Sequence, residues 1–209
     1  MISTSGLVKT FDNNKSIAFP DLHVAKSDTL LIHGPSGSGK TSLLHILSGL
    51  MRQSQGSVDI EGNKLEKLSD VQLDEFRGKN IGICLQRPVF IKSLTVIENL
   101  LIAQRIAHQN PDKNYCMSLL NEMGLTQCKD QLTNKLSQGE QQRLMFIRAL
   151  INKPKLILAD EPSSSLDDHN TDLLTNLMIQ HSSLHEATLI VVSHDDRLKK
   201  MFDNKILLS

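Results

Sequence analysis

Short hydrophobic runs alternate along this chain with stretches in which hydrophobic residues recur every three or four positions. The runs predict β-strands over residues 29–34, 56–62, 81–86, 155–161 and 187–193. The last two are almost continuously apolar, which is typical of parallel strands that are covered on both faces. The alternation of strand and helix patterns predicts an α/β fold.

Helical spacing of hydrophobic residues predicts helices over residues 40–51, 139–151 and 169–184. In the first of these, four leucines fall on one face: Leu43, Leu44, Leu47 and Leu50. The pattern indicates amphipathic helices of the kind that cover a sheet in an α/β fold.

Residues 87–135 interrupt the alternation, because no convincing strand pattern occurs there. Thr95 and Glu98 form a capping box ahead of an apolar run, and a helix pattern over 114–124 ends on Gly124, a favoured residue at helix ends. We therefore expect a helical insertion of about fifty residues in the α/β core.

The composition fits a soluble globular protein of one domain, with or without an inserted subdomain. The chain has 209 residues, of which 39% are hydrophobic and 22% charged. Aromatic residues make up only 3%, and the formal net charge is zero. These values argue against both a base-stacking platform and a basic footprint, and we expect no nucleic-acid partner.

The cysteines and the N-terminal residues bear on the expected compartment. Cys84, Cys116 and Cys128 form no CxxC pair, which favours buried thiols in a reducing cytoplasm over a disulfide framework or a cysteine zinc site. The first residues lack a signal-peptide pattern, and no apolar run reaches the roughly 18 residues needed to span a bilayer. We expect a cytoplasmic protein that reaches a membrane only through another chain.

The segment GPSGSGKT, residues 34–41, fits the phosphate-loop motif G-x-x-x-x-G-K-[ST] directly after a strand and before a helix. Its glycines let backbone N–H groups turn toward phosphates, and the helix dipole favours their charge. A chance match to a glycine-rich turn is the alternative, but this context makes it rare. Lys40 would reach the β- and γ-phosphates, Thr41 would bind Mg²⁺, and Ser42 would bond an α-phosphate oxygen. The expected nucleotide contacts are Gly34, Pro35, Ser36, Gly37, Ser38, Gly39, Lys40, Thr41 and Ser42.

Polar side chains end three further predicted strands, where ligands of parallel sheets bind. Asp160 is placed to hold Mg²⁺, usually through its water, and Glu161 to polarise an attacking water as general base. Gln86 and His194 end two other strands in the same way. Taken singly, these residues also fit solvated carboxylates, an edge amide and a structural histidine.

The segment LSQGEQQR, residues 136–143, contains neither a nucleophile–base pair nor a set of metal ligands. Ser137 and Glu140 predict a capping box at a helix start. The residues alone give no reason for so polar a helix entrance this far from the phosphate loop.

Taken together, these motifs make the chain resemble the ATP-binding cassette ATPases, in order and over nearly its whole length. GPSGSGKT resembles the Walker A loop, Gln86 the Q-loop, LSQGEQQR the signature, LILADEP the Walker B strand with Glu161 as catalytic residue, Ser163–Asp167 the D-loop and His194 the switch histidine. The resemblance implies a P-loop NTPase α/β core with a mainly parallel sheet, an N-terminal antiparallel β portion and an inserted α-helical subdomain. The implied division is 1–86 and 136–209 for the core and 87–135 for the subdomain.

The resemblance also implies how the signature acts. Two cassettes pair head to tail as a homodimer or paired cassettes, and Ser137, Gln138, Gly139 and Glu140 of each cap the ATP of the other. Lys40, Glu161 and His194 are then the catalytic residues, Asp167 belongs to the D-loop, and Mg²⁺ is held by Thr41, Asp160 and Gln86. Gln138 departs from the family, because a glycine is commoner there. Phe11 is the candidate to stack on adenine, with a role in the hydrophobic core as the alternative.

The closest resemblance within the family is to small stand-alone ATPases of lipoprotein-releasing and macrolide-efflux systems. These are cytoplasmic subunits, peripheral on the inner face of the membrane, that power a separate integral-membrane permease by hydrolysing ATP to ADP and phosphate. Two alternatives remain open: an ATPase that signals through a non-transporting membrane partner, and a soluble non-transport ATPase. Neither the transported substance nor the direction of transport can be read from the sequence.

Overall fold

A five-stranded parallel sheet forms the centre of the protein. The structure, a computed structural model, describes residues 1–12 and 15–209. The strand order is β10-β4-β9-β8-β7, and every neighbouring pair is parallel. The strands are β4 (Thr29–His33), β7 (Ile81–Cys84), β8 (Leu156–Asp160), β9 (Thr188–Ser193) and β10 (Lys205–Leu207). Four of the five predicted strands lie in this sheet. Because all its neighbouring strands are parallel, the prediction of parallel strands is confirmed.

The fifth predicted strand lies in a second, antiparallel sheet, together with most of the N-terminal residues. β1 is its central strand and pairs with β2, β3 and β5, while β6 pairs with β5. The strands are β1 (Ile2–Thr10), β2 (Ser16–Ala18), β3 (His23–Val24), β5 (Gln55–Ile60) and β6 (Asn63–Lys64). The expected N-terminal antiparallel portion is confirmed.

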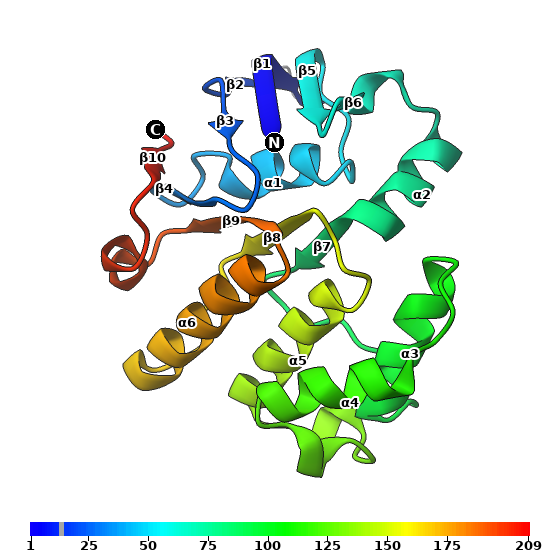
Figure 1. Ribbon diagram of the computed structural model, residues 1–209. Coiled ribbons are helices and arrows are strands. Elements are labelled where there is room, and N and C mark those ends of the chain that lie inside the picture. The colour runs from blue at the N-terminus through cyan, green and yellow to red at the C-terminus, as the bar shows by residue number, and fades with distance from the viewer. Residues whose placement is uncertain (13–14) are drawn as a thin grey trace.

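Helices cover both faces of the parallel sheet (Figure 1). They are α1 (Lys40–Leu47), α2 (Asp70–Asn80), α3 (Val96–Ile106), α4 (Lys113–Glu122), α5 (Gln138–Leu150) and α6 (Asp168–Leu184). In Figure 1, α1 and the antiparallel sheet lie on one side, and α5 and α6 lie on the other. The three helices predicted by spacing are confirmed, but α1 ends earlier than predicted. Gly49, with φ of 68°, ends it, and this leaves Leu50 exposed beyond the helix.

The helix α2 was not predicted by hydrophobic spacing, because Leu73 is its only buried residue. A local signal for it does exist. Ser69 accepts a hydrogen bond from the Gln72 N–H, and the Gln72 side chain accepts one from the Ser69 N–H, which completes a capping box. The sequence S-x-x-Q therefore marks a helix start that the apolar pattern misses.

Between β7 and α5, the described residues form α3, α4 and short 3₁₀ turns, with one isolated bridge between Thr95 and Leu132. The capping box of Thr95 and Glu98 is present, and Gly124 has φ of 66° just after α4. The inserted helical portion is thus confirmed, while the division at residues 86 and 136 stays a prediction.

Alternate residues of the central strands enter two hydrophobic cores. Leu156 and Leu158 of β8 pack toward α1 and the antiparallel sheet, whereas Ile157 and Ala159 pack toward α3, α4, α5 and α6. All four are fully buried, so β8 is covered on both faces as its apolar run predicts.

The three cysteines are free and buried, and burial raises the pKa of the Cys84 thiol to about 12.

Candidate active site

The phosphate loop joins β4 to α1, and its shape depends on glycines. Gly37 and Gly39 have φ of 84° and 95°. A Cβ on Gly39 would lie 3.2 Å from the ring of Phe19, so a side chain there would meet both strain and crowding. Gly39 is the N-cap of α1 and provides no side-chain hydrogen bond. The first N–H groups of α1 are therefore free to bind an anion.

The missing cap sets α1 apart from the other α-helices. Over residues 1–12 and 15–209, each of the other five has a side-chain oxygen bonded to its first turn: Ser69, Thr95, Asp112, Ser137 and Asp167. A phosphate oxygen would satisfy at α1 the donors that side chains satisfy elsewhere.

Lys40 lies buried at the start of α1 and faces back toward its own loop. Its Nζ donates to the carbonyl oxygens of Gly34 at 2.9 Å and Pro35 at 3.0 Å, and it lies 3.9 Å from Glu161 Oε1. A buried ammonium without such partners would be costly. The loop thus keeps a positive charge where phosphates would arrive.

Thr41 and Asp160 bring two oxygen donors together beside the loop. The Thr41 hydroxyl donates to Asp160 Oδ1 at 3.3 Å. Burial raises the pKa of Asp160; the hydrogen bond from Thr41 opposes this shift and the charge of Glu161 adds to it. A buried carboxylate beside a second carboxylate and a hydroxyl fits a hard cation such as Mg²⁺, which would offset the negative charge.

Glu161 and His194 meet where β8 and β9 end. Glu161 has φ of 47°, a left-handed conformation that is strained for a residue with a side chain. Its carboxylate accepts hydrogen bonds from the Ser193 hydroxyl at 2.7 Å and the His194 N–H at 3.1 Å, and His194 Nδ1 lies 2.8 Å from Oε1. Both carboxylate oxygens therefore accept hydrogen bonds, from Ser193 at the end of β9 and from His194 directly after it.

An ionic network that the sequence does not indicate links the D-loop to the segment after His194. Asp195 Oδ2 accepts a hydrogen bond from Ser163 at 2.8 Å. Arg197 donates to Asp195, to Asp168 and to the Leu166 carbonyl. These bonds from Arg197, followed by that from Ser163, lower the pKa of Asp195 to about 2 despite its burial. The partners come together only because β8 and β9 are neighbours, so no local pattern could reveal them.

The signature residues lie at the N-terminus of α5, in the expected capping box. Ser137 Oγ accepts from the Glu140 N–H at 3.4 Å and donates to Glu140 Oε2 at 2.8 Å. These hydrogen bonds from Ser137 hold the pKa of Glu140 below its usual value. The four residues Ser137 to Glu140 line a cavity of about 320 Å³ together with the D-loop residue Asp167.

The phosphate loop lines a different cavity, of about 410 Å³, with His194. This cavity and the signature cavity have no lining residue in common. Within one chain, Gly34, Pro35, Ser36 and His194 therefore line a different cavity from the signature residues Ser137–Glu140.

Gln86 and Phe11 are placed differently from the residues above. Gln86 lines a cavity with Gln138 and Ser164, between the signature and the D-loop. Phe11 follows β1 and its N–H bonds to the Lys15 carbonyl. Ile17 and Phe19, which the sequence analysis did not single out, pack near Gly39 of the phosphate loop. The roles of Gln86 in binding Mg²⁺ and of Phe11 in stacking on adenine stay predictions.

Comparison with known proteins places this arrangement in a family. The sequence profile described as "ABC transporter" matches residues 20–164. The lipoprotein-releasing system ATP-binding protein LolD of Bacteroides fragilis is 37% identical over 209 residues, covering 99% of this chain and 96% of its own. LolD of Bacteroides thetaiotaomicron is 38% identical over 208 residues, covering 99% and 95%.

Solved structures agree with the sequence comparison. The dimeric structure of the ABC transporter cassette MJ0796 has a TM-score of 0.90 and 28% identity, covering 100% of this chain and 94% of that one. A second dimeric structure of MJ0796, in a post-hydrolysis state with ADP and Pi, matches equally well. This chain therefore belongs to the ABC transporter family, as an ATP-binding cassette that hydrolyses ATP.

Proposed function

We propose that this cassette is the ATPase subunit of a membrane transporter and that two copies pair head to tail around two ATP molecules. The observation that carries the proposal is the separation of the phosphate-loop cavity from the signature cavity within one chain. A second copy, turned end to end, brings its signature to the ATP held by the first. The dimeric MJ0796 structures support this pairing.

In the proposed site, the phosphates bind the open N-terminus of α1 and the buried Lys40, which exchanges carbonyl contacts for phosphate oxygens. Thr41, Asp160 and Gln86 would hold Mg²⁺. When bound, this ion neutralises charge on the β- and γ-phosphates. Lys40 and the N–H groups of the loop orient the γ-phosphate for attack.

Hydrolysis requires a water molecule beside the γ-phosphate and a base to activate it. Glu161 is the base, because its carboxylate lies next to Lys40 at the end of β8. Its contact with His194 keeps the carboxylate engaged before ATP arrives. His194 then turns from Glu161 to the γ-phosphate, which frees a carboxylate oxygen for water. The signature of the partner supplies the Ser137 hydroxyl and the Gly139 N–H as further donors.

Replacing Ser137 with arginine tests the shared site. ATP should bind a single chain normally, while ATP-driven dimerisation should weaken by about 10²-fold, since each charge-assisted bond to phosphate is worth about 1.5–3 kcal/mol. Size-exclusion chromatography with light scattering measures the dimer, and a fluorescent ATP analogue measures binding.

Ser69→Arg is the matched control, because Ser69 is also an exposed serine in a capping box and its loss costs helix α2 a similar amount, about 0.5–2 kcal/mol. The control should dimerise normally. Loss of ATP binding by monomeric Ser137→Arg would place the signature in the same chain's site and overturn the proposal.

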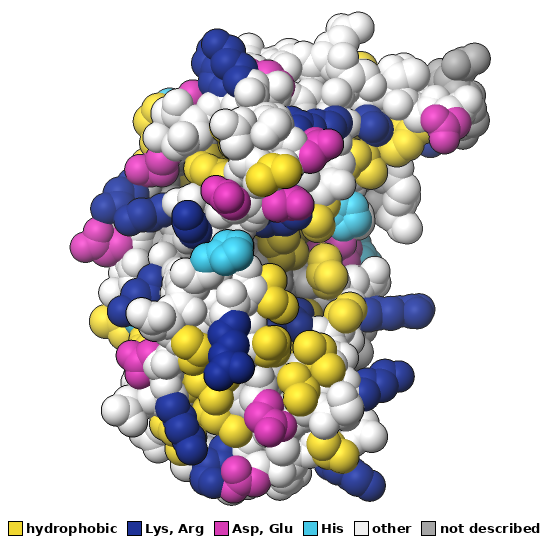
Figure 2. Space-filling view, turned by 90° about the vertical axis from the view of Figure 1, so that its right-hand side faces the viewer, with side chains coloured by type: hydrophobic (Ala, Val, Ile, Leu, Met, Phe, Trp, Pro, Cys, Tyr) yellow, Lys and Arg dark blue, Asp and Glu magenta, His cyan; other side chains and the backbone are white. Residues whose placement is uncertain are grey.

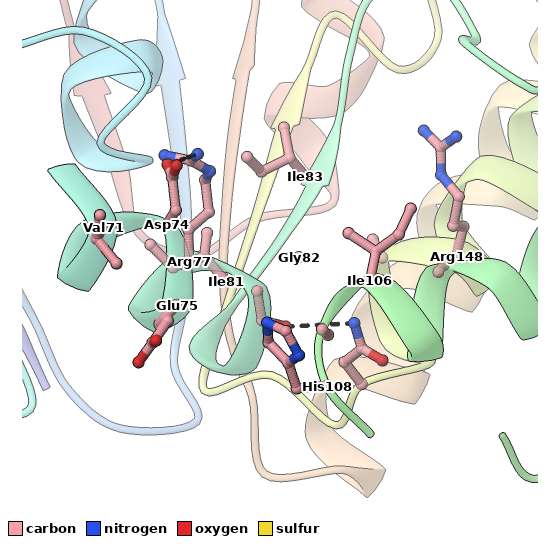
Figure 3. Close-up of a pocket in the computed structure, with 15 residues that line it drawn as sticks. Val71, Asp74, Glu75, Arg77, Ile81, Gly82, Ile83, Ile106, His108 and Arg148 are labelled. Atoms are coloured by element: carbon pink, nitrogen blue, oxygen red, sulfur yellow. Dashed lines mark hydrogen bonds and ion pairs between the residues drawn. The ribbon is translucent and has the colours of Figure 1, made fainter. Parts of the chain in front are cut away.

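The docking site that we propose for the permease is a groove between α2, β7, α3 and α5, of about 640 Å³ (Figure 3). Gly82 lies on its floor, where a Cβ would be 2.3 Å from the Ala149 carbonyl oxygen, so the floor needs a glycine. In Figure 3, Val71 and Arg77 of α2 lie on one side of Gly82, and Ile106 and Arg148 lie on the other.

The groove has the chemistry of a site for an amphipathic helix. Val71 and Ile106, on opposite walls, are each 70% exposed, and charged residues flank them. Figure 2 shows hydrophobic side chains gathered around a hollow on this face, with Lys and Arg at its margins. An apolar stripe inserted between charged walls is the usual mode of helix-in-groove recognition. We assign the groove to a cytoplasmic helix of the permease.

The described residues include no helix that is long and apolar enough to cross a bilayer. We propose that the cassette lies at the cytoplasmic face of the inner membrane and contacts it through the permease. The names of the relatives favour a permease of a lipoprotein-releasing system. A membrane partner that signals and does not transport could occupy the same groove.

Ile106→Asp tests the groove. A carboxylate forced into the apolar interface costs several kcal/mol, so capture of an integral-membrane partner from detergent-solubilised membranes should fall at least about tenfold. Leu184→Asp, which alters an exposed leucine at the end of α6, should capture the partner normally. Equal capture by wild type and Ile106→Asp would place the partner elsewhere.

A further inference from the structure

Three potential metal ligands converge where the C-terminus of α6 meets the C-terminus of α4. His181 and His185 are four residues apart, on one face at the end of α6, and Glu122 is the last residue of α4. One ligand atom from each side chain lies within 4.8 Å of the others. In the part of the chain that the structure describes, this is the one group of three or more such side chains.

The two histidines have ring nitrogens that are buried and lack hydrogen-bond partners. His181 Nδ1 lies 3.3 Å from Glu122 Oε2, but the geometry is not that of a hydrogen bond, so the nitrogen remains unsatisfied. His185 Nε2 is also buried without a partner. A buried polar atom left in this way costs free energy and calls for an explanation. A bound cation that accepts a lone pair from each of these two nitrogens would remove the cost.

The surroundings hold these side chains in place. Ser118 donates a hydrogen bond of 2.7 Å to Glu122 Oε1, which leaves Oε2 directed at His181. The two imidazole rings stack at 6.2 Å, and Tyr115 packs edge-on against His185 at 6.3 Å. His181 is itself buried, with only 4% of its surface exposed.

We propose that Glu122, His181 and His185 bind one divalent transition-metal ion of the zinc class. Two imidazoles and a carboxylate are a ligand set that zinc uses, with water completing the tetrahedron. Bonds of about 2.0–2.1 Å in that geometry place ligand atoms about 3.3 Å apart, so the three atoms, now within 4.8 Å of one another, would have to approach by up to about 1.5 Å. Glu122 is exposed, which gives the ion a route from solvent.

The ion would join two parts of the molecule that are distant in sequence. α4 lies in the helical segment between β7 and α5, whereas α6 follows β8 and the D-loop. Because Glu122 and the two histidines would coordinate the same ion, the ion would link the end of α4 to the end of α6. This site is independent of the Mg²⁺-ATP site, because none of its ligands lines the phosphate-loop or signature cavity.

Calorimetric titration of the nucleotide-free, full-length protein with ZnCl₂ tests the proposal. Wild type should bind one ion per chain. His181→Gln, His185→Gln and Glu122→Gln should each weaken binding by more than tenfold, since even the residues that merely orient metal ligands contribute about 10–100-fold. His169→Gln, an exposed histidine at the start of the same helix, should bind as wild type does.

Two further measurements make the result decisive if a histidine variant folds poorly. Glu122→Gln alters an exposed residue, and circular dichroism with ATP binding verifies its fold. Co²⁺ in place of zinc should give the strong visible absorption of a four-coordinate site without thiolate bands. Unchanged zinc affinity in Glu122→Gln, equal weakening in His169→Gln, or thiolate bands from Cys116 or Cys128 would each overturn the assignment.

Discussion

Glu161→Gln should lower ATP turnover by about 10²–10⁴-fold, because an amide cannot accept the proton of the attacking water. ATP binding should persist, and an ATP-bound dimer should accumulate. The fold should survive, since the glutamine carbonyl can still accept the hydrogen bond of the Ser193 hydroxyl or the His194 N–H. Phosphate release measures turnover, and light scattering measures the trapped dimer.

Glu186→Gln is the matched control for this variant. Glu186 itself also has a left-handed backbone conformation, with φ of 53°, but its side chain is exposed and pairs with Lys26. Its replacement should leave turnover within twofold or so of wild type, as surface ion pairs contribute about 0–1 kcal/mol to stability. Wild-type hydrolysis by Glu161→Gln would remove Glu161 from the role of base.

Lys40→Ala should weaken ATP binding by about 10²–10⁴-fold. Two charge-assisted hydrogen bonds to phosphate, of about 1.5–3 kcal/mol each, disappear together. In the nucleotide-free protein the change removes a buried charge and its two carbonyl contacts, so the fold should tolerate it. Equilibrium binding of a fluorescent ATP analogue measures the loss.

Lys26→Ala provides the comparison for Lys40→Ala. Lys26 precedes β4, so it lies at the end of the strand opposite the phosphate loop, and its partner Glu186 is exposed. Removing it should leave ATP affinity unchanged. If Lys40→Ala bound ATP as tightly as the Lys26 variant, the phosphates would have to bind elsewhere.

Much of the fold could be predicted because its signals are local. The continuous apolar run around Leu158 predicts a strand buried on both faces, and alternate residues of β8 do enter two cores. α2 escaped prediction because a helix with one buried side chain has no apolar period. Leu50 was assigned to a helix face because spacing alone cannot place the end that Gly49 imposes.

Part of the candidate site could also be predicted from the sequence, and part could not. Parallel strands end at one edge, so Asp160, Glu161 and His194 could be expected to lie close together, and His194 Nδ1 is 2.8 Å from Glu161. The contact that engages Glu161 before ATP arrives could not be expected, because it depends on side-chain directions. The network around Asp195 and Arg197 depends on strand order, which no single motif records.

The first turn of α1 has no side-chain cap, so its N–H groups gain a partner from the nucleotide when it binds. A ligand held at a thousand times its dissociation constant stabilises its protein by about 4 kcal/mol, a large part of the margin that keeps a domain folded. Saturation with nucleotide should therefore raise the unfolding temperature of this chain and slow its digestion by a protease.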